Sequence, residues 1–413
     1  MLKAVISSML LLLVFASCND LVDDNNNQII KDGFTSWIKI DPTNSKKIVA
    51  SEIFEKDYEI VKLESIDTCL VGNIEQLVVA DNKYFILDKE YTRAVYVYDS
   101  SGNFLSKIDK YGEGPGHYRE LGDFFVDTIN KEINILQTYP AILLTFDYSG
   151  NFVKQKKIFN YAWQIAINGS NNYCLFMLNK IVSDKIMHDL VIVNEKGKVL
   201  SKYFPINPKD PSKITVMPNN FVSFGDSLSF IRSFSDTIYD ITSNILFAKY
   251  IIDFGKHNIP PNFFDKYLLD DGNPLNVIKK AELAMERNNY AREIYPYCES
   301  ESYVYFGYRY NSKLNQAFYS KKTDKVIYTN KLVNDINYLP FKFSNVLLMK
   351  NNTLILKLSA HTLINRLSKF KKTMTEKQWQ YFLLHNDELV NVASTLSKSD
   401  NPILFIYKFK DSF

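Results

Sequence analysis

The most specific local motif that could carry chemistry is the glycine-rich run from Gly112 to Tyr118. Glycine-rich loops can cradle phosphate groups with backbone N–H groups, but such loops continue into a Lys-Ser/Thr pair and a helix. Neither follows here, so the motif does not predict a phosphate site. One interpretation is a ligand-binding loop in which His117, Tyr118 and Arg119 contact the ligand. The alternative is a rigid connector whose glycines adopt positive φ angles.

No other group of residues forms a pattern typical of catalysis or metal binding. The five histidines share no ligand spacing, and the sequence has no HExxH, nucleophile-elbow or acidic calcium-loop motif. Glu299 and Glu301 lie two positions apart and could act as a catalytic pair of carboxylates. The alternative, which is the commoner one, is that both lie in a solvated loop. The sequence therefore predicts no catalytic residue, no metal site and no cofactor. Three cysteines lack zinc-site spacing and are expected to be buried as small apolar side chains: Cys69, Cys174 and Cys298.

The N-terminal segment has the composition of an export signal. Lys3 precedes an apolar run over residues 4–16, which is too short to span a bilayer as a helix. Small residues directly before Cys18 resemble a bacterial lipobox, which implies a lipoprotein signal peptide at residues 1–17 and a lipid on Cys18. The alternative is an ordinary signal peptide with an incidental cysteine. Residues 18–35 are largely polar and are predicted to form a flexible tether.

The composition of the 413-residue chain indicates a β-rich globular domain without a nucleic-acid partner. The chain contains 27 Tyr and 29 Phe, which favour strands. Its net charge is only +3 at pH 7, and its densest basic cluster is limited to Lys369, Lys371 and Lys372. Nucleic-acid binding would require a basic patch or stripe, which the sequence lacks, so the charges predict a mixed, solvated surface.

A repeat predicts the architecture. The segments 98–105 and 146–153 are near copies of each other, and each has a strand, a tight turn and a second strand. Asp99 and Asp147 occupy equivalent places 48 residues apart, and Asn194 and Asp240 continue the series after 47 and 46 residues. Each Asp or Asn side chain is expected to accept hydrogen bonds from the N–H groups of its own turn.

Each repeat contains four short antiparallel strands joined by hairpins, which is the pattern of one β-propeller blade. The last unit has only three strands near the C-terminus, and the segment 58–64 can supply its fourth. Counted in this way, residues 36–413 form an all-β domain, a six-bladed β-propeller closed by that N-terminal strand.

Two helical insertions interrupt the repeats, near residues 262–291 and 373–386. In the first, apolar residues recur at spacings of three and four and are expected to pack against the outside of the sheets. These residues are Leu275, Ile278, Ala281 and Met285. The second insertion begins with Thr375 and Gln378, which have the spacing of a capping box.

Several segments carry a resemblance to one family. They are Ile60–Glu64, Gly72–Ile74, Phe85–Asp88, Val97–Asp99 with Gly102–Phe104, and Gly112–Tyr118. With these segments the chain resembles the six-bladed β-propeller lipoproteins of Bacteroides-type bacteria, which are similar to NHL-repeat propellers. The last motif has His117 where the family usually has an acidic residue, so no role for that carboxylate carries over. The resemblance implies a place at the cell envelope in recognition or glycan-related processes.

Three functions fit these observations. The leading one is a lipid-anchored, non-catalytic module that recognises a glycan, peptide or protein partner at the cell envelope. The alternative is an envelope lyase or hydrolase whose active site is dispersed at the mouth of the propeller channel, and a third is a structural subunit of an envelope complex. A mouth that gathers two or more carboxylates would favour the enzyme, whereas an apolar or aromatic mouth would favour binding.

The first prediction concerns the lipid anchor. The substitution Cys18→Ala removes the thiol that would carry the lipid, so we expect the protein to leave the membrane fraction of cells. Immunoblots of membrane and soluble fractions measure this, with Asn26→Ala in the same polar segment as a control. Unchanged membrane association of Cys18→Ala would refute lipid attachment at this residue.

Overall fold

The computed structural model describes residues 35–178, 180, 188–207, 217–267, 273–411 and 413. The predicted signal peptide at 1–17, Cys18 and the predicted tether up to residue 34 lie outside this range. Among the described residues, no helix is long and apolar enough to cross a membrane.

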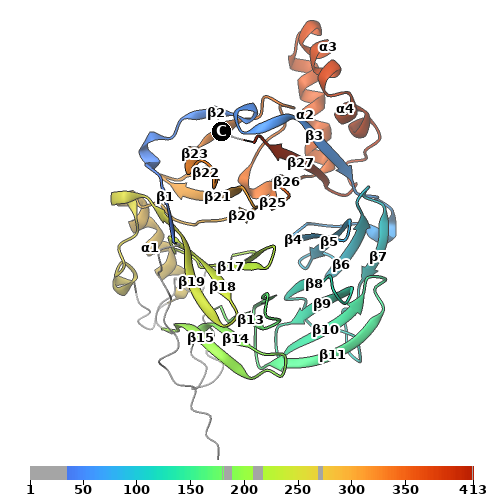
Figure 1. Ribbon diagram of the computed structural model, residues 1–413. Coiled ribbons are helices and arrows are strands. Elements are labelled where there is room, and N and C mark those ends of the chain that lie inside the picture. Colours follow the sequence, from blue (N-terminus) through green and yellow to red (C-terminus); the bar gives the residue numbers. More distant parts are fainter. Residues whose placement is uncertain (1–34, 179, 181–187, 208–216, 268–272, 412) are drawn as a thin grey trace, which may run out of the picture.

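Most of the described chain forms sheets of four consecutive antiparallel strands, which lie around a common centre as in a propeller (Figure 1). We number six of these sheets in chain order. Sheet 1 contains β4 (Gln76–Ala80), β5 (Lys83–Asp88), β6 (Ala94–Asp99) and β7 (Phe104–Ile108). Sheet 2 contains β8 (Asp123–Asp127), β9 (Glu132–Gln137), β10 (Ala141–Asp147) and β11 (Phe152–Phe159). Sheet 3 contains β12 (Gln164–Ile167), β13 (Tyr173–Phe176), β14 (His188–Val193) and β15 (Val199–Pro205).

The other three sheets follow the same strand order. Sheet 4 contains β16 (Phe221–Phe224), β17 (Ser227–Ile231), β18 (Thr237–Thr242) and β19 (Ile245–Asp253), with β1 (Ser36–Lys39) added in parallel to β19. Sheet 5 contains β20 (Tyr297–Glu299), β21 (Tyr303–Tyr310), β22 (Lys313–Ser320) and β23 (Lys325–Thr329). Sheet 6 contains β25 (Val346–Lys350), β26 (Thr353–Leu358), β27 (Ile403–Phe409) and β3 (Phe54–Lys62). A separate two-stranded sheet pairs β2 (Lys47–Val49) with β24 (Lys331–Val333).

The strand order divides the loops between two faces of the ring. Because neighbouring strands are antiparallel, the first strand of each sheet begins at the face where the second strand ends. We call this the entry face, and it carries the connections between sheets and those between second and third strands. The opposite face, which we call the turn face, carries the hairpins such as 99–104. The segment 112–119 connects β7 to β8 and therefore lies on the entry face.

The repeated turns have the hydrogen bonds that the sequence predicts at three of the four positions. Asp99 Oδ1 accepts from the N–H groups of Ser101 and Asn103, both at 2.9 Å. Asp147 and Asn194 accept from the equivalent N–H groups two and four residues later. The prediction is wrong for Asp240, which lies within β18 and accepts from the Ser227 and Thr242 hydroxyl groups instead.

Each repeated turn also contacts the preceding sheet through its glycine. Gly102, Gly150 and Gly197 have φ angles of 88°, 83° and 76°, which L side chains rarely adopt. A Cβ atom on Gly197 would lie 2.7 Å from the carbonyl oxygen of Ile158, and one on Gly102 would overlap the carbonyl oxygen of Lys62. The glycines are therefore needed both for the turn and for close packing between consecutive sheets.

The last sheet joins the two ends of the described chain. β27 pairs antiparallel with β3, with Leu404 opposite Val61. The pairing strand runs from Phe54 to Lys62, so it starts four residues before the predicted segment 58–64 and ends two residues before its end. Aromatic packing holds this sheet together, since the rings of Phe54 and Phe409 have centroids 4.8 Å apart.

The helices are more extensive than the sequence indicates. α1 (Pro274–Arg287) lies in the predicted first insertion, and α3 (Glu376–His385) lies in the predicted second one, near 373–386. α2 (Ala360–Thr373) and α4 (Asp387–Ser394) flank α3 and lie outside the predicted bounds. The capping box at α3 is confirmed, because the Thr375 N–H donates to Gln378 Oε1 at 2.9 Å and the Gln378 N–H donates to Thr375 Oγ1. Short 3-10 helices are η2 (Pro42–Asn44), η3 (Ala50–Glu52), η4 (Asp67–Cys69), η6 (Gly255–His257), η7 (Phe264–Lys266) and η8 (Phe343–Asn345).

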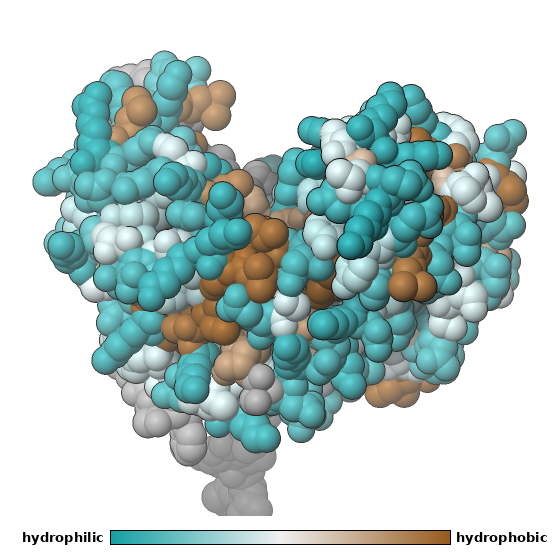
Figure 2. All heavy atoms as spheres, turned by 90° about the horizontal axis from the view of Figure 1, so that it is seen from above, coloured by the Kyte–Doolittle hydropathy of each residue, from teal (hydrophilic) through white to brown (hydrophobic). Residues whose placement is uncertain are grey.

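Burial tests two of the side-chain predictions. In α1, Ala281 and Met285 are buried, but they pack with Phe263 and other residues outside the strands, not against a sheet as expected. Leu275 is 72% exposed and Ile278 is only partly buried. The three cysteines of the described chain are free and buried, as predicted. The face of the molecule in Figure 2 is mostly hydrophilic, and apolar side chains gather in a hollow between two raised parts of that face.

A matched pair of glycine substitutions tests the packing between sheets. Gly102 and Gly225 both have positive φ angles, but a Cβ atom on Gly225 would meet nothing within 4 Å. We expect Gly225→Ala to lower the free energy of unfolding by about 1 kcal/mol, the cost of the backbone angle alone. Gly102→Ala also displaces the backbone at Lys62, so we expect a loss of about 3 kcal/mol or more. Urea unfolding measures both, and equal losses would contradict the packing role.

Candidate functional site

The glycine-rich loop is anchored to the body of the protein by Tyr118. The Tyr118 side chain is fully buried, and its hydroxyl group donates to the carbonyl oxygen of Arg93 at 2.6 Å. Burial raises the pKa of this hydroxyl well above its ordinary value. Gly112, Gly114 and Gly116 all have positive φ angles. This geometry is that of the rigid connector, and Tyr118 does not offer its side chain to a ligand.

The other two residues predicted in this loop lie at the surface. His117 is exposed, and its Nδ1 lies 3.1 Å from the carbonyl oxygen of Pro115. The guanidinium group of Arg119 lies 3.2 Å from Glu113 Oε1, and both side chains are mostly exposed, so the pair adds little stability. The Tyr118 side chain is therefore buried, whereas those of His117 and Arg119 are exposed. Ligand contact by His117 and Arg119 stays a prediction.

The entry face contains a cavity of about 390 Å³. Its walls come from segments that precede first strands and from the β21–β22 hairpin, together with the end of β26. The lining residues are Asn73, Ile74, Glu75, Pro218, Glu293, Tyr295, Tyr308, Arg309, Leu314, Phe343, Ser344, Val346, Leu347 and Lys357. These segments belong to sheets 1, 4, 5 and 6, so the cavity lies where loops of four sheets converge.

One side of the cavity carries Lys357 and Glu75. The Lys357 ammonium group donates to Asn73 Oδ1 and to the carbonyl oxygen of Ile74, both at 2.6 Å. Burial lowers the pKa of Lys357 and raises that of Glu75. The Glu75 carboxylate accepts from the Asn73 amide at 3.0 Å and from the Lys89 N–H at 2.9 Å. The segment before β4 is thus held to β26 by polar contacts.

Another part of the wall carries an ion pair between Glu293 and Arg309. Arg309 Nε lies 2.8 Å from Glu293 Oε2, and both side chains are one-third exposed. The wall behind them depends on Gly307, because a Cβ atom there would lie 2.5 Å from the carbonyl oxygen of Tyr295 and 3.0 Å from the Phe343 ring. The cavity therefore combines two carboxylates and two cations with aromatic and aliphatic walls.

No sequence pattern marks the four charged residues of the cavity as a group. They lie far apart in the chain, and only the ring of sheets brings them together. One signal was present, because Gly72–Ile74 is among the segments that carry the family resemblance and it leads directly into Glu75. Lys357 and Arg309 gave no such signal, since a single charged residue near a strand end is common on protein surfaces.

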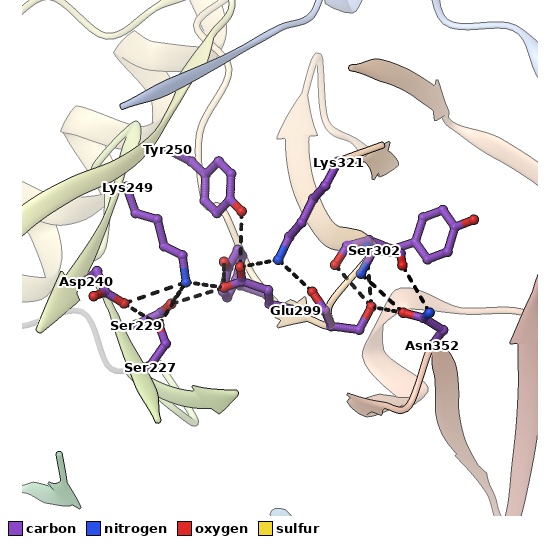
Figure 3. Close-up of polar contacts among 12 residues, drawn as sticks. Ser227, Ser229, Asp240, Lys249, Tyr250, Glu299, Ser302, Lys321 and Asn352 are labelled. Carbon is purple, nitrogen blue, oxygen red and sulfur yellow. Dashed lines mark hydrogen bonds and ion pairs between the residues drawn. The ribbon is translucent and has the colours of Figure 1, made fainter. Parts of the chain in front are cut away.

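A second polar cluster, at the turn-face end of β20, corrects the expectation for Glu299 and Glu301. Glu299 is 2% exposed and lies between sheets 4 and 5, whereas Glu301 is exposed (Figure 3). Glu299 Oε2 lies 2.8 Å from Lys249 Nζ, and Oε1 lies 2.6 Å from Lys321 Nζ. Neither a paired carboxylate nor a solvated loop describes Glu299.

The Glu299 carboxylate is saturated with partners. The Tyr297 hydroxyl donates to Oε2 at 2.7 Å and the Tyr250 hydroxyl donates to Oε1 at 3.0 Å, in addition to the two lysines. Burial opposes ionisation of Glu299, but the Lys249 and Lys321 ammonium groups outweigh it and hold its pKa below the ordinary value. With every oxygen occupied, this cluster links two sheets and has no free acceptor for a ligand.

Within the described chain, no group of three or more His, Cys, Asp or Glu residues is placed to hold a metal ion.

Comparisons with known proteins place the fold. Residues 36–408 match the sequence profile of a family described as Domain of unknown function (DUF4934). The solved structure of a protein from Bacteroides fragilis whose name describes it as exported has a TM-score of 0.72 and 19% identity, over 91% of this chain and 99% of that chain. A member of the duf4221 family from Bacteroides vulgatus has a TM-score of 0.48 and 10% identity, over 86% of this chain and 98% of that chain. No curated protein matches the chain.

The Glu299 cluster predicts a strong and pH-dependent effect on stability. Glu299→Gln removes the carboxylate that Lys321 contacts and leaves Lys249 with only Asp240, at 3.6 Å, so we expect the free energy of unfolding to fall by about 3 kcal/mol at neutral pH. Because its folded pKa lies below the ordinary value of 4.5, ionised Glu299 stabilises the fold above that pH, and this contribution is lost as the pH falls through the folded pKa. The difference between wild type and variant should therefore shrink on acidification.

Urea unfolding over a pH series measures this difference. Glu301→Gln is the matched control, since the exposed Glu301 side chain should change stability by less than about 0.5 kcal/mol. If both variants lose the same stability, or if the loss for Glu299→Gln grows on acidification, the ion-pair account is wrong.

Proposed function

The chain belongs to the DUF4934 family, and we propose that it is a lipid-anchored propeller of the cell envelope that binds a glycan, peptide or protein partner without transforming it. The observation that carries this proposal is the cavity on the entry face, where loops of sheets 1, 4, 5 and 6 converge. Its volume of about 390 Å³ lies within the range typical of small-ligand sites.

We infer that the numbered sheets are the six blades of a closed, NHL-like propeller spanning residues 36–413. The four-stranded antiparallel pattern of these sheets supports this count, and so does the pairing of β27 with β3. The lipid anchor at Cys18 and an extracytoplasmic location belong to the same proposal. The similar Bacteroides fragilis protein, which is named as exported, supports export of this chain.

The walls of the cavity support binding as the main activity. Tyr295, Phe343 and Leu347 are only partly buried and provide apolar surface, while the charged residues provide orienting polar groups. Sites that combine mostly apolar walls with a few placed polar groups are typical of ligand recognition. Both carboxylates in the cavity already accept hydrogen bonds or ion pairs from the protein, which favours a fixed recognition surface over proton transfer.

One observation favours the alternative, an envelope lyase or hydrolase. The cavity holds two carboxylates, Glu75 and Glu293, and burial raises the pKa of Glu75. A carboxyl group with a raised pKa can act as a general acid near neutral pH. Under this alternative Glu75 would donate the proton, and the arginine and lysine would orient the substrate.

A binding screen with a cavity variant tests the proposal. We expect the full-length protein to bind members of a glycan and peptide panel, and Leu314→Trp to weaken this binding at least about tenfold by filling the cavity. Leu314 is 40% exposed at the cavity wall, and Leu275→Trp on α1 is the matched control because Leu275 is exposed away from it. Thermal melting shows whether each variant is folded.

The outcomes separate the two functions. Equal binding by wild type and Leu314→Trp, or no binding to any member of the panel, would refute the cavity as the binding site. Product analysis of each bound ligand is run in parallel. Turnover that Glu75→Gln abolishes would establish the enzyme and refute the non-catalytic proposal.

A further inference from the structure

We propose that the ligand of this cavity is a sugar that bears a carboxylate, such as a uronic acid, and that Lys357 and Arg309 bind its carboxylate group. The inference rests on the proposed function, because it names the ligand class of the same cavity. Its basis is the hydrogen bonding in the cavity. Some polar groups already bond to the protein, whereas others remain available to a ligand.

Lys357 has spare donor capacity and no counter-ion in contact. Its ammonium group has three N–H donors, and the neutral oxygens of Asn73 and Ile74 take two of them. Among the described residues, no carboxylate lies within ion-pair distance of its Nζ. The nearby Glu75 carboxylate is engaged by the Asn73 amide and the Lys89 N–H instead. A largely buried ammonium group without a contacting anion is unfavourable, and an anionic ligand would relieve this cost.

Arg309 offers a second set of free donors. Its Nε pairs with Glu293 at 2.8 Å, while its two terminal NH₂ groups make no hydrogen bond to any residue of the described chain. The side chain is 33% exposed at the cavity, so these groups are accessible. The guanidinium fork matches the two oxygens of a carboxylate and binds it with charge-assisted hydrogen bonds.

The carboxylates of the cavity have charged or polar partners within the protein, whereas the two cations keep unused donors. Both oxygens of Glu75 accept from the protein, and Glu293 Oε2 accepts from Arg309 Nε at 2.8 Å, while Glu293 Oε1 lies 3.5 Å from Arg292 Nε without a hydrogen bond. The Tyr308 hydroxyl, which lines the cavity, also has no hydrogen-bond partner within the described chain. The unused donors of the two cations favour an anionic acceptor, and a carboxylate provides one with the geometry that suits arginine.

The apolar walls indicate a compact sugar as the bearer of that carboxylate. Tyr295 and Phe343 line the cavity beside the donors and are partly exposed. A sugar ring combines an apolar face, which can lie against such side chains, with hydroxyl groups at its rim. A cavity of about 390 Å³ accommodates a small ligand and not a long chain segment.

Calorimetric titration of the full-length protein with galacturonate and with its methyl ester tests the inference. The ester keeps the size and hydroxyl groups of the sugar but removes the negative charge, so we expect it to bind at least about tenfold more weakly. Lys357→Met and Arg309→Gln should each weaken binding of the acid by a similar factor and leave binding of the ester nearly unchanged. Arg309→Gln keeps the contacts of Lys357 with the segment before β4, so it tests the site even if Lys357→Met does not fold.

Lys313→Met is the matched control, because Lys313 is exposed at the start of β22 and does not line the cavity. Equal affinity for acid and ester, or full affinity in Arg309→Gln, would refute carboxylate recognition while leaving a binding function in place. Binding of a peptide with a free C-terminus, but of neither sugar, would refute the sugar assignment. If no ligand binds to the wild type, the proposed function itself fails.

Discussion

The pairing of β3 with β27 is the constraint on which the rest of the structure depends. A sheet that ends at β27 would expose an unpaired edge of backbone N–H and C=O groups, which is both costly and prone to association. The N-terminal strand fills that edge, with Leu404 opposite Val61, and joins the start of the described domain to its end. The same contact sets the position of sheet 1 relative to sheet 6, because Gly102 packs against the carbonyl oxygen of Lys62 in β3.

The two faces of the ring carry different kinds of loops. The turn face holds the short hairpins whose Asp, Asn and Gly residues are used by turn geometry and by packing between sheets. The entry face holds the longer connections, including the segment before β20 that contains α1 and the segment before β27 that contains α2 to α4. These connections meet across sheet boundaries, as Lys357 and Asn73 do, and so bring charged residues of several sheets to one cavity on this face.

Charge compensation distinguishes the structural cluster from the candidate site. At Glu299, one carboxylate meets two ammonium groups and three hydroxyl groups, so the charges and the acceptors are satisfied within the protein. At the cavity, Lys357 meets only neutral oxygens and Arg309 keeps terminal donors free. Hydrogen-bond donors of charged groups that the protein leaves unused are a physical indication of where a ligand binds.

The features that the sequence determined by itself are those built from neighbouring residues. The turns at Asp99 and Asp147, the capping box at Thr375 and the burial of the cysteines depend on contacts within a few residues or on side-chain polarity alone. Only the tertiary structure decided which charged residues meet. Lys357 contacts Asn73 across 284 positions of the chain, and Glu299 meets Lys249 of sheet 4 and Lys321 after β22 at separations of 50 and 22 positions, so no local pattern could predict these contacts. Asp240 has the spacing of the repeat but lies inside β18. The hairpin that follows it in the chain is tighter than the other repeated turns, since Thr242 still pairs with Ile245.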